Sequence, residues 1–413
     1  MFSVKPIAAM IIQPAKRTAS VKEYYFSVKN KEIAALSAER LARGEDPVIN
    51  LGIGSPDGTP PRSAIDALCE CAVRDGVHGY QPYTGIPELR RSLADWYRRY
   101  YRVQLDPATE IQPLTGSKEG ILITSLTFLD KGDKVLVPDP GYPTYSSASL
   151  MVEADMIKYD LTAVNGWYPD FDALEKMDLT GVKLMWTNYP GMPTGAKATK
   201  ELYRRLVDFG RRHGILIVND NPYSFVLNDE PLSILEVPGA KDCCLEMNSL
   251  SKAHNMAGWR IGMIAGDPAL IREILKVKSQ MDSGIFRGLQ EAAVKALSEG
   301  DGWFSSLNAV YRRRKDIVWR IFDLLEAEYD RDTAGLFVWG KVSGGTFEKL
   351  GLTPDPAVSP GQQVSDRILY GCGVFITPGF IFGHNGEGYI RASLCAPEET
   401  LERAFGRIKE LLR

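Results

Sequence analysis

Residues 182–220 read VKLMWTNYPGMPTGAKATKELYRRLVDFGRRHGILIVND. The apolar runs VKLMWT at the start and ILIV near the end are typical of strands buried on both faces of a parallel sheet. Between them, Leu202, Leu206 and Phe209 fall on one stripe of a helix. This helical pattern ends in Arg-Arg-His before Gly214, and cations followed by glycine suit a helix C-terminus. The stretch therefore predicts a strand–helix–strand unit.

The same alternation extends through the middle of the chain. Further apolar runs lie at 134–138, 243–247 and 261–265. We predict a doubly wound α/β fold, in which a large domain (56–302) has a mostly parallel central sheet flanked by helices. Longer helical patterns at both ends predict a smaller α+β domain built from residues 1–55 and 303–413. One of these helices carries a basic run at 312–315, which we expect to form a solvated face.

The composition is that of an ordinary globular protein. The chain has 413 residues, of which 44% are hydrophobic and 24% are charged, and its net charge is -3. These values exclude disordered and collagen-like classes of protein. They also show no excess of basic residues that would attract nucleic acid. No apolar run approaches the roughly 20 residues that cross a bilayer, and the segment Pro6 to Ile12 is too short for a secretion signal. We expect a cytoplasmic protein without nucleic-acid or membrane partners.

The cysteines do not form a metal-binding pattern. There are six cysteines and four histidines; Cys69 and Cys71 are two positions apart, and Cys243 and Cys244 are adjacent. A zinc site needs well-spaced pairs with further ligands nearby. We therefore expect reduced, mostly buried thiols and no metal site.

The segment with the most candidate catalytic and binding side chains is SLSKAHNMAGWRIG, which runs from Ser249 to Gly262. A lone lysine after a strand, such as Lys252, is ordinarily a solvated surface residue. Schiff-base chemistry, however, needs an amine held near a carbonyl, and a phosphate-bearing cofactor needs donors around it. Ser249 and Arg260 are donors of the required kind.

Two other segments stand where ligands bind in α/β proteins. Asp220 ends a predicted strand, where a carboxylate could hold a proton on a pyridine nitrogen, and Tyr223 could donate to a phenolate oxygen of the same ring. Taken alone, this Asp is better explained as the cap of the next turn than as a ligand-binding residue. The run TGSKEG from Thr115 opens an apolar helix, where free N–H groups attract an anion or form an ordinary helix cap.

Two turns complete the pattern. The run NYPGMPTG from Asn188 follows a predicted strand, and PGYP contains Tyr142. Tyr142 could stack on an aromatic ligand or pack within a tight turn. Neither turn is specific by itself.

Together, these segments resemble the aminotransferases of class I and II, the pyridoxal-phosphate enzymes of fold type I. The resemblance covers roughly residues 48–395 and is most specific at SxSK followed by NMAGWRIG; GSKEG, PGYP, NYPxxPTG, DxxY and YIRAS accompany it in family order. It implies a pyridoxal-5'-phosphate-dependent amino-acid aminotransferase with ping-pong kinetics. An L-amino acid would give its nitrogen to a 2-oxo acid, for which 2-oxoglutarate is the expected acceptor.

The resemblance also implies roles for individual residues. Lys252 would form the Schiff base and then move the substrate proton. Asp220 would pair with the pyridinium nitrogen, Tyr223 with the phenolate oxygen, and Tyr142 would stack on the ring. The residues expected around the phosphate are Gly116, Ser117, Lys118, Ser249 and Arg260.

On the substrate side, the resemblance implies that Arg391 clamps the α-carboxylate and that Gly54 closes over the substrate. Asn188 is expected to contact both cofactor and substrate. Tyr80 matches the tyrosine that reaches the phosphate of the neighbouring subunit, which implies a homodimer with shared active sites.

One position departs from the family pattern. Met192 stands where the family has an Asn that donates a hydrogen bond to the phenolate oxygen. Methionine cannot donate, so we expect the cofactor-bound state to keep its proton to higher pH, with Asn188 retained for the carboxylate.

Several interpretations stay open. The same residues support C–S β-lyases and decarboxylases, because substrate orientation decides which bond breaks. Aspartate, alanine, methionine, an aromatic amino acid and diaminopimelate are all candidate donors. Arg287 is interpreted as a surface arginine, and the Tyr24-Tyr25-Phe26 cluster as core or dimer contact rather than as a substrate lid.

Overall fold

The structure is a computed structural model that describes residues 11–413. The first ten residues of the predicted small domain, and most of the Pro6–Ile12 segment, lie outside this range. Within it, no helix is long and apolar enough to cross a membrane. None of the six cysteines is in a disulfide.

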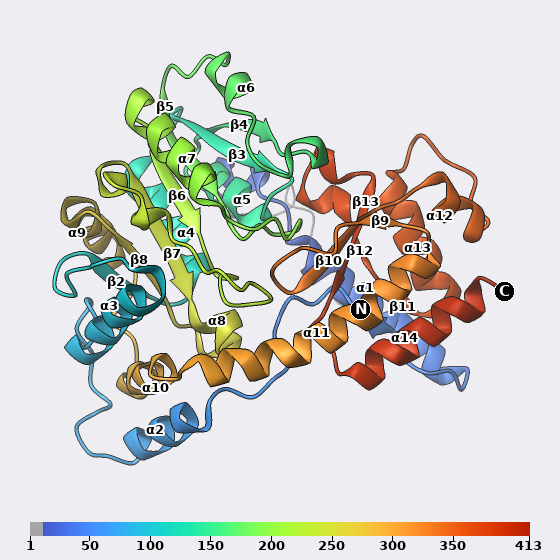
Figure 1. The fold of residues 1–413 in the computed structure, drawn as a ribbon, viewed down its shortest axis with the longest axis horizontal. Coiled ribbons are helices and arrows are strands. Elements are labelled where there is room, and N and C mark those ends of the chain that lie inside the picture. Colours follow the sequence, from blue (N-terminus) through green and yellow to red (C-terminus); the bar gives the residue numbers. More distant parts are fainter. Residues whose placement is uncertain (1–10) are drawn as a thin grey trace.

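The large sheet has seven strands in the order β2-β8-β7-β6-β5-β3-β4 (Figure 1). Their bounds are β2 (Ile111–Leu114), β3 (Lys134–Asp139), β4 (Asp155–Asp160), β5 (Val182–Thr187), β6 (Leu216–Asp220), β7 (Cys244–Ser249) and β8 (Gly262–Gly266). Strands β7, β6, β5, β3 and β4 are parallel, and β8 runs antiparallel to both β7 and β2. The predicted mostly parallel sheet is confirmed; β2, β4 and the antiparallel direction of β8 were not predicted.

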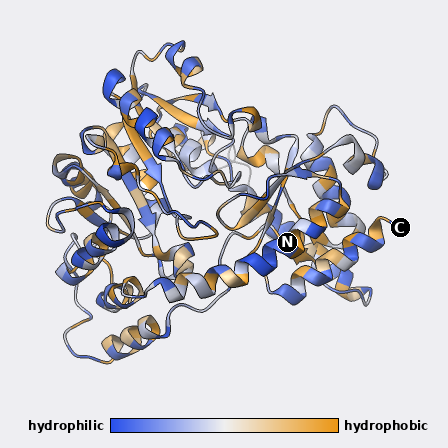
Figure 2. Cartoon of the chain, in the orientation of Figure 1, coloured by the Kyte–Doolittle hydropathy of each residue, from blue (hydrophilic) through white to orange (hydrophobic). Residues whose placement is uncertain are grey.

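Both faces of this sheet are buried, as the apolar runs predicted. Successive strand residues point to opposite faces, so Met185 and Ile217 join the core on one face and Trp186 and Val218 the core on the other. The helices around the large sheet are α2 (Arg62–Ala72), α3 (Pro87–Tyr101), α4 (Ser117–Phe128), α5 (Pro143–Met151), α6 (Phe171–Glu175), α7 (Lys200–His213), α8 (Leu250–Ala253), α9 (Pro268–Lys278) and α10 (Arg287–Leu297). Figure 2 shows hydrophobic colouring in the strands, between helices whose ribbons alternate blue and orange.

A second, antiparallel sheet lies on the other side of the molecule (Figure 1). Its strands are β12 (Thr377–Pro378), β13 (Tyr389–Ser393), β10 (Phe337–Lys341) and β9 (Glu328–Tyr329). The helices on this side are α1 (Tyr25–Ala42), α11 (Asp301–Leu324), α12 (Gly344–Lys349), α13 (Pro360–Cys372) and α14 (Glu398–Leu411).

A short parallel pair joins the two ends of the chain. Strand β1 (Ile49–Asn50) pairs with β11 (Val374–Phe375). We keep the division into 56–302 and 1–55 plus 303–413 as a proposal that this pairing supports, although α11 already begins at Asp301.

The expectation for the basic run 312–315 is wrong for two of its residues. Arg314 and Lys315 are buried on α11, a helix that packs against α14 and strand β10. Arg314 makes a bidentate ion pair with Asp57, with Nη1–Oδ1 at 2.6 Å and Nη2–Oδ2 at 2.9 Å. Lys315 Nζ donates to the Thr333 carbonyl at 2.6 Å.

A buried histidine beside the lysine segment predicts acid sensitivity. His254 is 1% exposed, packs against Phe304, and has no hydrogen-bond partner within residues 11–413 for either ring nitrogen. Burial lowers the pKa of His254 to about 3. In the unfolded chain this pKa returns to about 6.5, so as pH falls below that value the unfolded state takes up the proton first.

We therefore expect the free energy of unfolding of the wild type, relative to that of His254→Leu, to fall by about 1.4 kcal/mol per pH unit between pH 6 and pH 4. Urea unfolding of both proteins across this range measures the difference. A constant difference would contradict the prediction.

Candidate functional site

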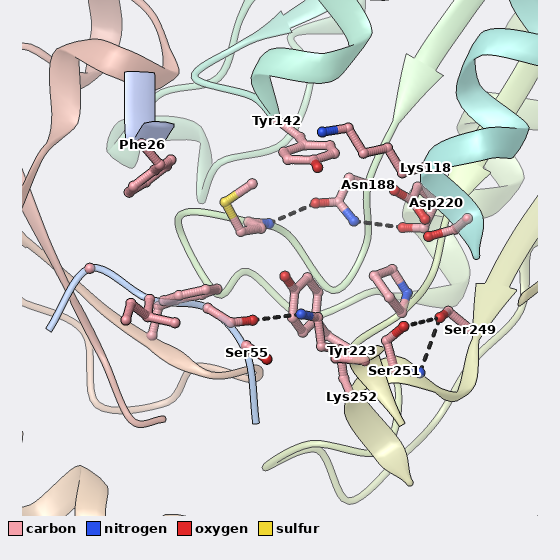
Figure 3. A pocket seen from close by; sticks show the side chains of 18 of the residues that line it. Phe26, Ser55, Lys118, Tyr142, Asn188, Asp220, Tyr223, Ser249, Ser251 and Lys252 are labelled. Carbon is pink, nitrogen blue, oxygen red and sulfur yellow. Dashed lines mark hydrogen bonds between the residues drawn. The ribbon is translucent and has the colours of Figure 1, made fainter. Parts of the chain in front are cut away.

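One cavity of about 500 Å³ gathers most of the predicted site residues at the carboxyl ends of β5, β6 and β7. The predicted residues that line it are Gly54, Ser117, Lys118, Tyr142, Asn188, Asp220, Tyr223, Ser249, Lys252, Arg260 and Arg391. They come from segments as far apart in sequence as the loop after β1 and strand β13 (Figure 3). The cavity lies where ligands bind in open α/β sheets.

Asp220 ends β6 as a buried carboxylate with only one oxygen in a hydrogen bond. Tyr145 donates to Oδ2 at 3.0 Å, and Oδ1 has no partner within the described chain. Burial raises the pKa of Asp220 to about 7, against the hydrogen bond from Tyr145 and the positive charge of Lys252. A cationic N–H group in the cavity would satisfy the free oxygen and restore the ionised carboxylate.

Arg391 in β13 is a buried cation that has no carboxylate partner within the described part of the chain. Its Nη2 donates to the Gly52 carbonyl at 3.0 Å, its Nη1 lies 3.3 Å from Met192 Sδ, and the Phe337 ring centroid lies 3.9 Å from its Cζ. Nε has no hydrogen-bond partner among residues 11–413. Burial lowers the pKa of Arg391 to about 10. Because an unpaired buried charge is unfavourable, this arginine is suited to binding an anion.

Lys252 lies in the short helix α8 directly after β7. Its Nζ donates to the Gly54 carbonyl at 2.5 Å (Figure 3). Burial lowers the pKa of Lys252, and the charges of Arg260 and Arg391 act in the same direction. A lysine with a lowered pKa is more often in its nucleophilic neutral form.

The loop before α4 and the segment 249–260 form a cradle for an anion. Gly116 has φ of 80°, and a Cβ atom there would collide with Arg260 Nη2, so only glycine suits this position. Ser117 follows at the N-terminus of α4, an end of a helix whose dipole favours an anion. On the facing segment, Ser249 Oγ lies 2.8 Å from Ser251 Oγ.

The remaining predicted residues lie around these groups. Burial raises the pKa of Tyr223, whose ring packs at right angles to that of Phe337. Asn188 Nδ2 donates to the Asp220 carbonyl at 2.6 Å, and its Oδ1 accepts from Met192 N at 2.8 Å. Both ends of the Asn188 amide therefore contact the backbone, which anchors the turn that carries Met192.

Tyr80 and Arg287 lie away from this cavity. Tyr80 is 92% exposed and does not line the cavity of the single chain. Arg287 begins α10 and pairs with Glu291 at 2.7 Å, as expected of a surface arginine.

The interpretation of the Tyr24-Tyr25-Phe26 cluster is wrong in part. Tyr25 packs in a small core with Ile33 and Leu369, but Tyr24 and Phe26 line the cavity. Sequence reasoning also missed Tyr145, Ser251 and Phe337. Two of these residues had a signal: Ser251 is the second serine of SxSK, and Tyr145 lies three residues after Tyr142, the residue that precedes α5.

Comparison with known proteins agrees with this geometry. The family described as "Aminotransferase class I and II" matches residues 46–408. The LL-diaminopimelate aminotransferases of Oleidesulfovibrio alaskensis and Dehalococcoides mccartyi are 39% and 37% identical, over 96% and 95% of this chain and 98% and 97% of theirs. The structure titled substrate-bound BacF from Bacillus subtilis has a TM-score of 0.87 at 32% identity, covering 97% of this chain and 98% of that one.

The chain belongs to the class I and II aminotransferase family. It is an aminotransferase, it depends on pyridoxal phosphate, and its substrates are an amino acid and a 2-oxo acid. The residues present fit this cofactor. The unpartnered Asp220 oxygen suits a protonated ring nitrogen, and the group of Ser117, Lys118, Ser249 and Arg260 in the cavity wall suits a phosphate.

Proposed function

We propose that this enzyme transfers the amino group of an L-amino acid to 2-oxoglutarate, with Lys252 as the amine that holds the cofactor and moves the substrate proton. The observation that carries the proposal is the meeting, in one cavity, of the Lys252 amine, a carboxylate with a free oxygen and an arginine without a counter-ion.

Bound pyridoxal phosphate supplies an electrophilic carbonyl and a ring that accepts electrons. In the proposed site, Asp220 holds the proton on the ring nitrogen. Tyr223 donates to the phenolate oxygen, and Tyr142 stacks on the ring. The phosphate is held by Gly116, Ser117, Lys118, Ser249 and Arg260.

The substrate would lie between Lys252 and Arg391. Arg391 binds the α-carboxylate, the loop at Gly54 closes over it, and Asn188 orients the turn beside it. Lys252 Nζ then takes the proton from the substrate Cα, which its lowered pKa favours.

The charges in the cavity support an anionic substrate. Four cationic side chains line it, and Asp220 is the only described lining residue with a carboxylate. The cationic residues are Lys118, Lys252, Arg260 and Arg391. A phosphate and the substrate α-carboxylate would offset most of this excess of positive charge.

We also propose a homodimer in which Tyr80 contributes to the phosphate site of the second copy. The exposure of this tyrosine, and its place outside the cavity of its own chain, support this arrangement. Sedimentation equilibrium of the cofactor-loaded protein tests it, and a monomer would contradict it.

The visible absorption spectrum tests the proposed function. We expect a band from the bound cofactor that bleaches with one amino acid and returns with 2-oxoglutarate. A band that does not return, with release of pyruvate, ammonia or carbon dioxide, would instead indicate a lyase or decarboxylase.

Met192→Asn tests the departure from the family pattern. An Asn amide there would donate to the phenolate oxygen, and such a bond to a charged oxygen contributes about 1.5–3 kcal/mol. We expect the pH midpoint of the visible band to fall by roughly one to two units in the variant. Spectral titration of both proteins measures it, and an unchanged midpoint would show that Met192 does not set this pKa.

A further inference from the structure

The substrate end of the cavity is apolar. Near Arg391 its wall is formed by Phe26 and Phe337, together with Ile53 and Tyr24, whose ring centroid also lies 4.7 Å from Lys118 Nζ. Figure 3 shows Phe26 on the side of the cavity away from Ser249, and so away from the proposed phosphate site. Three aromatic rings favour contact with an apolar group, because each buries a large area on binding.

Helix α1 supplies much of this wall. Phe26 and Asn30 are four residues apart and both face the cavity, with Tyr24 just before the helix. The Phe26 ring centroid lies 5.6 Å from that of Tyr24 and 5.7 Å from Arg391 Cζ. A substrate held by Arg391 would therefore place its side chain against Phe26.

The charges at this end do not suit a second ammonium group. Asp220, the only carboxylate among the described lining residues, ends β6 and hydrogen-bonds Tyr145, on the proposed cofactor side. The other charged lining residues are all cationic. Tyr80, which we propose a second copy contributes, brings no carboxylate. An ammonium group at the far end of a substrate would be buried without a counter-ion.

We propose that the amino donor has an uncharged, apolar side chain, with aromatic amino acids preferred, and that Phe26 is a residue that determines this specificity. The inference rests on the proposed aminotransferase function. It differs from the substrate in the names of the relatives, because diaminopimelate carries a second ammonium and carboxylate at its far end.

The first half-reaction separates this inference from the proposed function. The cofactor-loaded protein is mixed with one amino acid and no acceptor, and the rate of bleaching and the 2-oxo acid formed are measured. The amino acids are L-phenylalanine, L-leucine, L-alanine, L-aspartate, L-lysine and LL-diaminopimelate. We expect the rate constant per unit concentration to be about 100-fold higher for phenylalanine than for lysine or diaminopimelate.

Equal or faster reaction of aspartate or diaminopimelate would overturn the inference and leave the aminotransferase function standing. Failure of every amino acid to bleach the band would instead contradict the proposed function.

A binding measurement gives a readout that does not depend on turnover. Calorimetry of the cofactor-loaded protein compares the affinity for 3-phenylpropanoate, which has an aromatic ring, with that for propanoate, which has none. We expect binding of 3-phenylpropanoate to be roughly 10- to 100-fold tighter. Equal affinities would overturn the apolar assignment.

Two variants locate the specificity. Phe26→Ala is expected to weaken 3-phenylpropanoate binding about tenfold and to change propanoate binding less than threefold. The matched control is Val28→Ala, also in the first turn of α1, whose side chain does not line this cavity and should leave both affinities unchanged. Asn30→Asp adds a carboxylate of the same shape and should raise the lysine-to-phenylalanine rate ratio about fivefold. Equal weakening of both ligands in Phe26→Ala would overturn the role of Phe26, and an unchanged ratio in Asn30→Asp would overturn the charge argument.

Discussion

Replacing Lys252 with alanine is expected to lower kcat at least about 10⁴-fold, because the other described lysine that lines the cavity, Lys118, is assigned to the phosphate. Lys252 Nζ reaches the Gly54 carbonyl inside the cavity, and burial lowers its pKa. The groups proposed to hold the phosphate and the ring stay in place, so the variant should still bind the cofactor. Single-turnover absorption with the preferred amino acid measures the loss.

Two controls separate chemistry from misfolding. After borohydride reduction, mass spectrometry should find the cofactor attached to residue 252 of the wild type and to no residue of Lys252→Ala. Lys349→Ala, at a lysine whose side chain is 50% exposed in α12, should behave as wild type. A Lys252→Ala enzyme that turns over at more than about a hundredth of the wild-type rate would rule out this role.

Replacing Arg391 with methionine is expected to give opposite changes in activity and stability. The loss of a bidentate carboxylate contact should lower kcat/KM by about 10²–10³-fold. The substrate-free protein should become more stable by about 1–2 kcal/mol, because methionine removes a buried charge that has no counter-ion. The lowered pKa of Arg391 already reflects this unfavourable burial.

Arg314 offers a matched control for that prediction. It is also a buried arginine, but it is paired with Asp57. Arg314→Met leaves that carboxylate unpaired and should lower the free energy of unfolding by about 1–3 kcal/mol. Urea unfolding and steady-state kinetics of both variants check these results. A destabilised Arg391→Met protein with unchanged kcat/KM would contradict the assignment of Arg391 as the carboxylate-binding residue.

Much of the large sheet was predictable because its signals are local. The apolar runs gave β5 at its observed bounds and placed β3, β6, β7 and β8 to within two residues at either end. The two-residue strands β1, β9, β11 and β12 escaped prediction. Segments of that length have no measurable periodicity, and they are defined only by the partner strand.

Part of the candidate site was also predictable from local motifs, and part was not. Motifs carried by one loop, such as Lys252 with Ser249 and Arg260, predicted which residues would share the cavity. The partners that set their electrostatics come from distant segments. Arg391 contacts the Gly52 carbonyl and the Met192 sulfur, across 339 and 199 positions of sequence. No local pattern encodes such contacts.

The sequence by itself determined the alternation of strands and helices, the family resemblance and the identity of the groups that do chemistry. These properties depend on residue type, periodicity and short spacing, all of which can be recognised in the linear sequence. Only the tertiary structure decided that Tyr24 and Phe26 face the cavity, that Arg314 is buried against Asp57, and that Arg391 has no counter-ion among the described residues. Burial and the pairing of charges depend on which distant segments pack together, so the substrate end of the site, unlike the lysine segment, could be interpreted only in the folded chain.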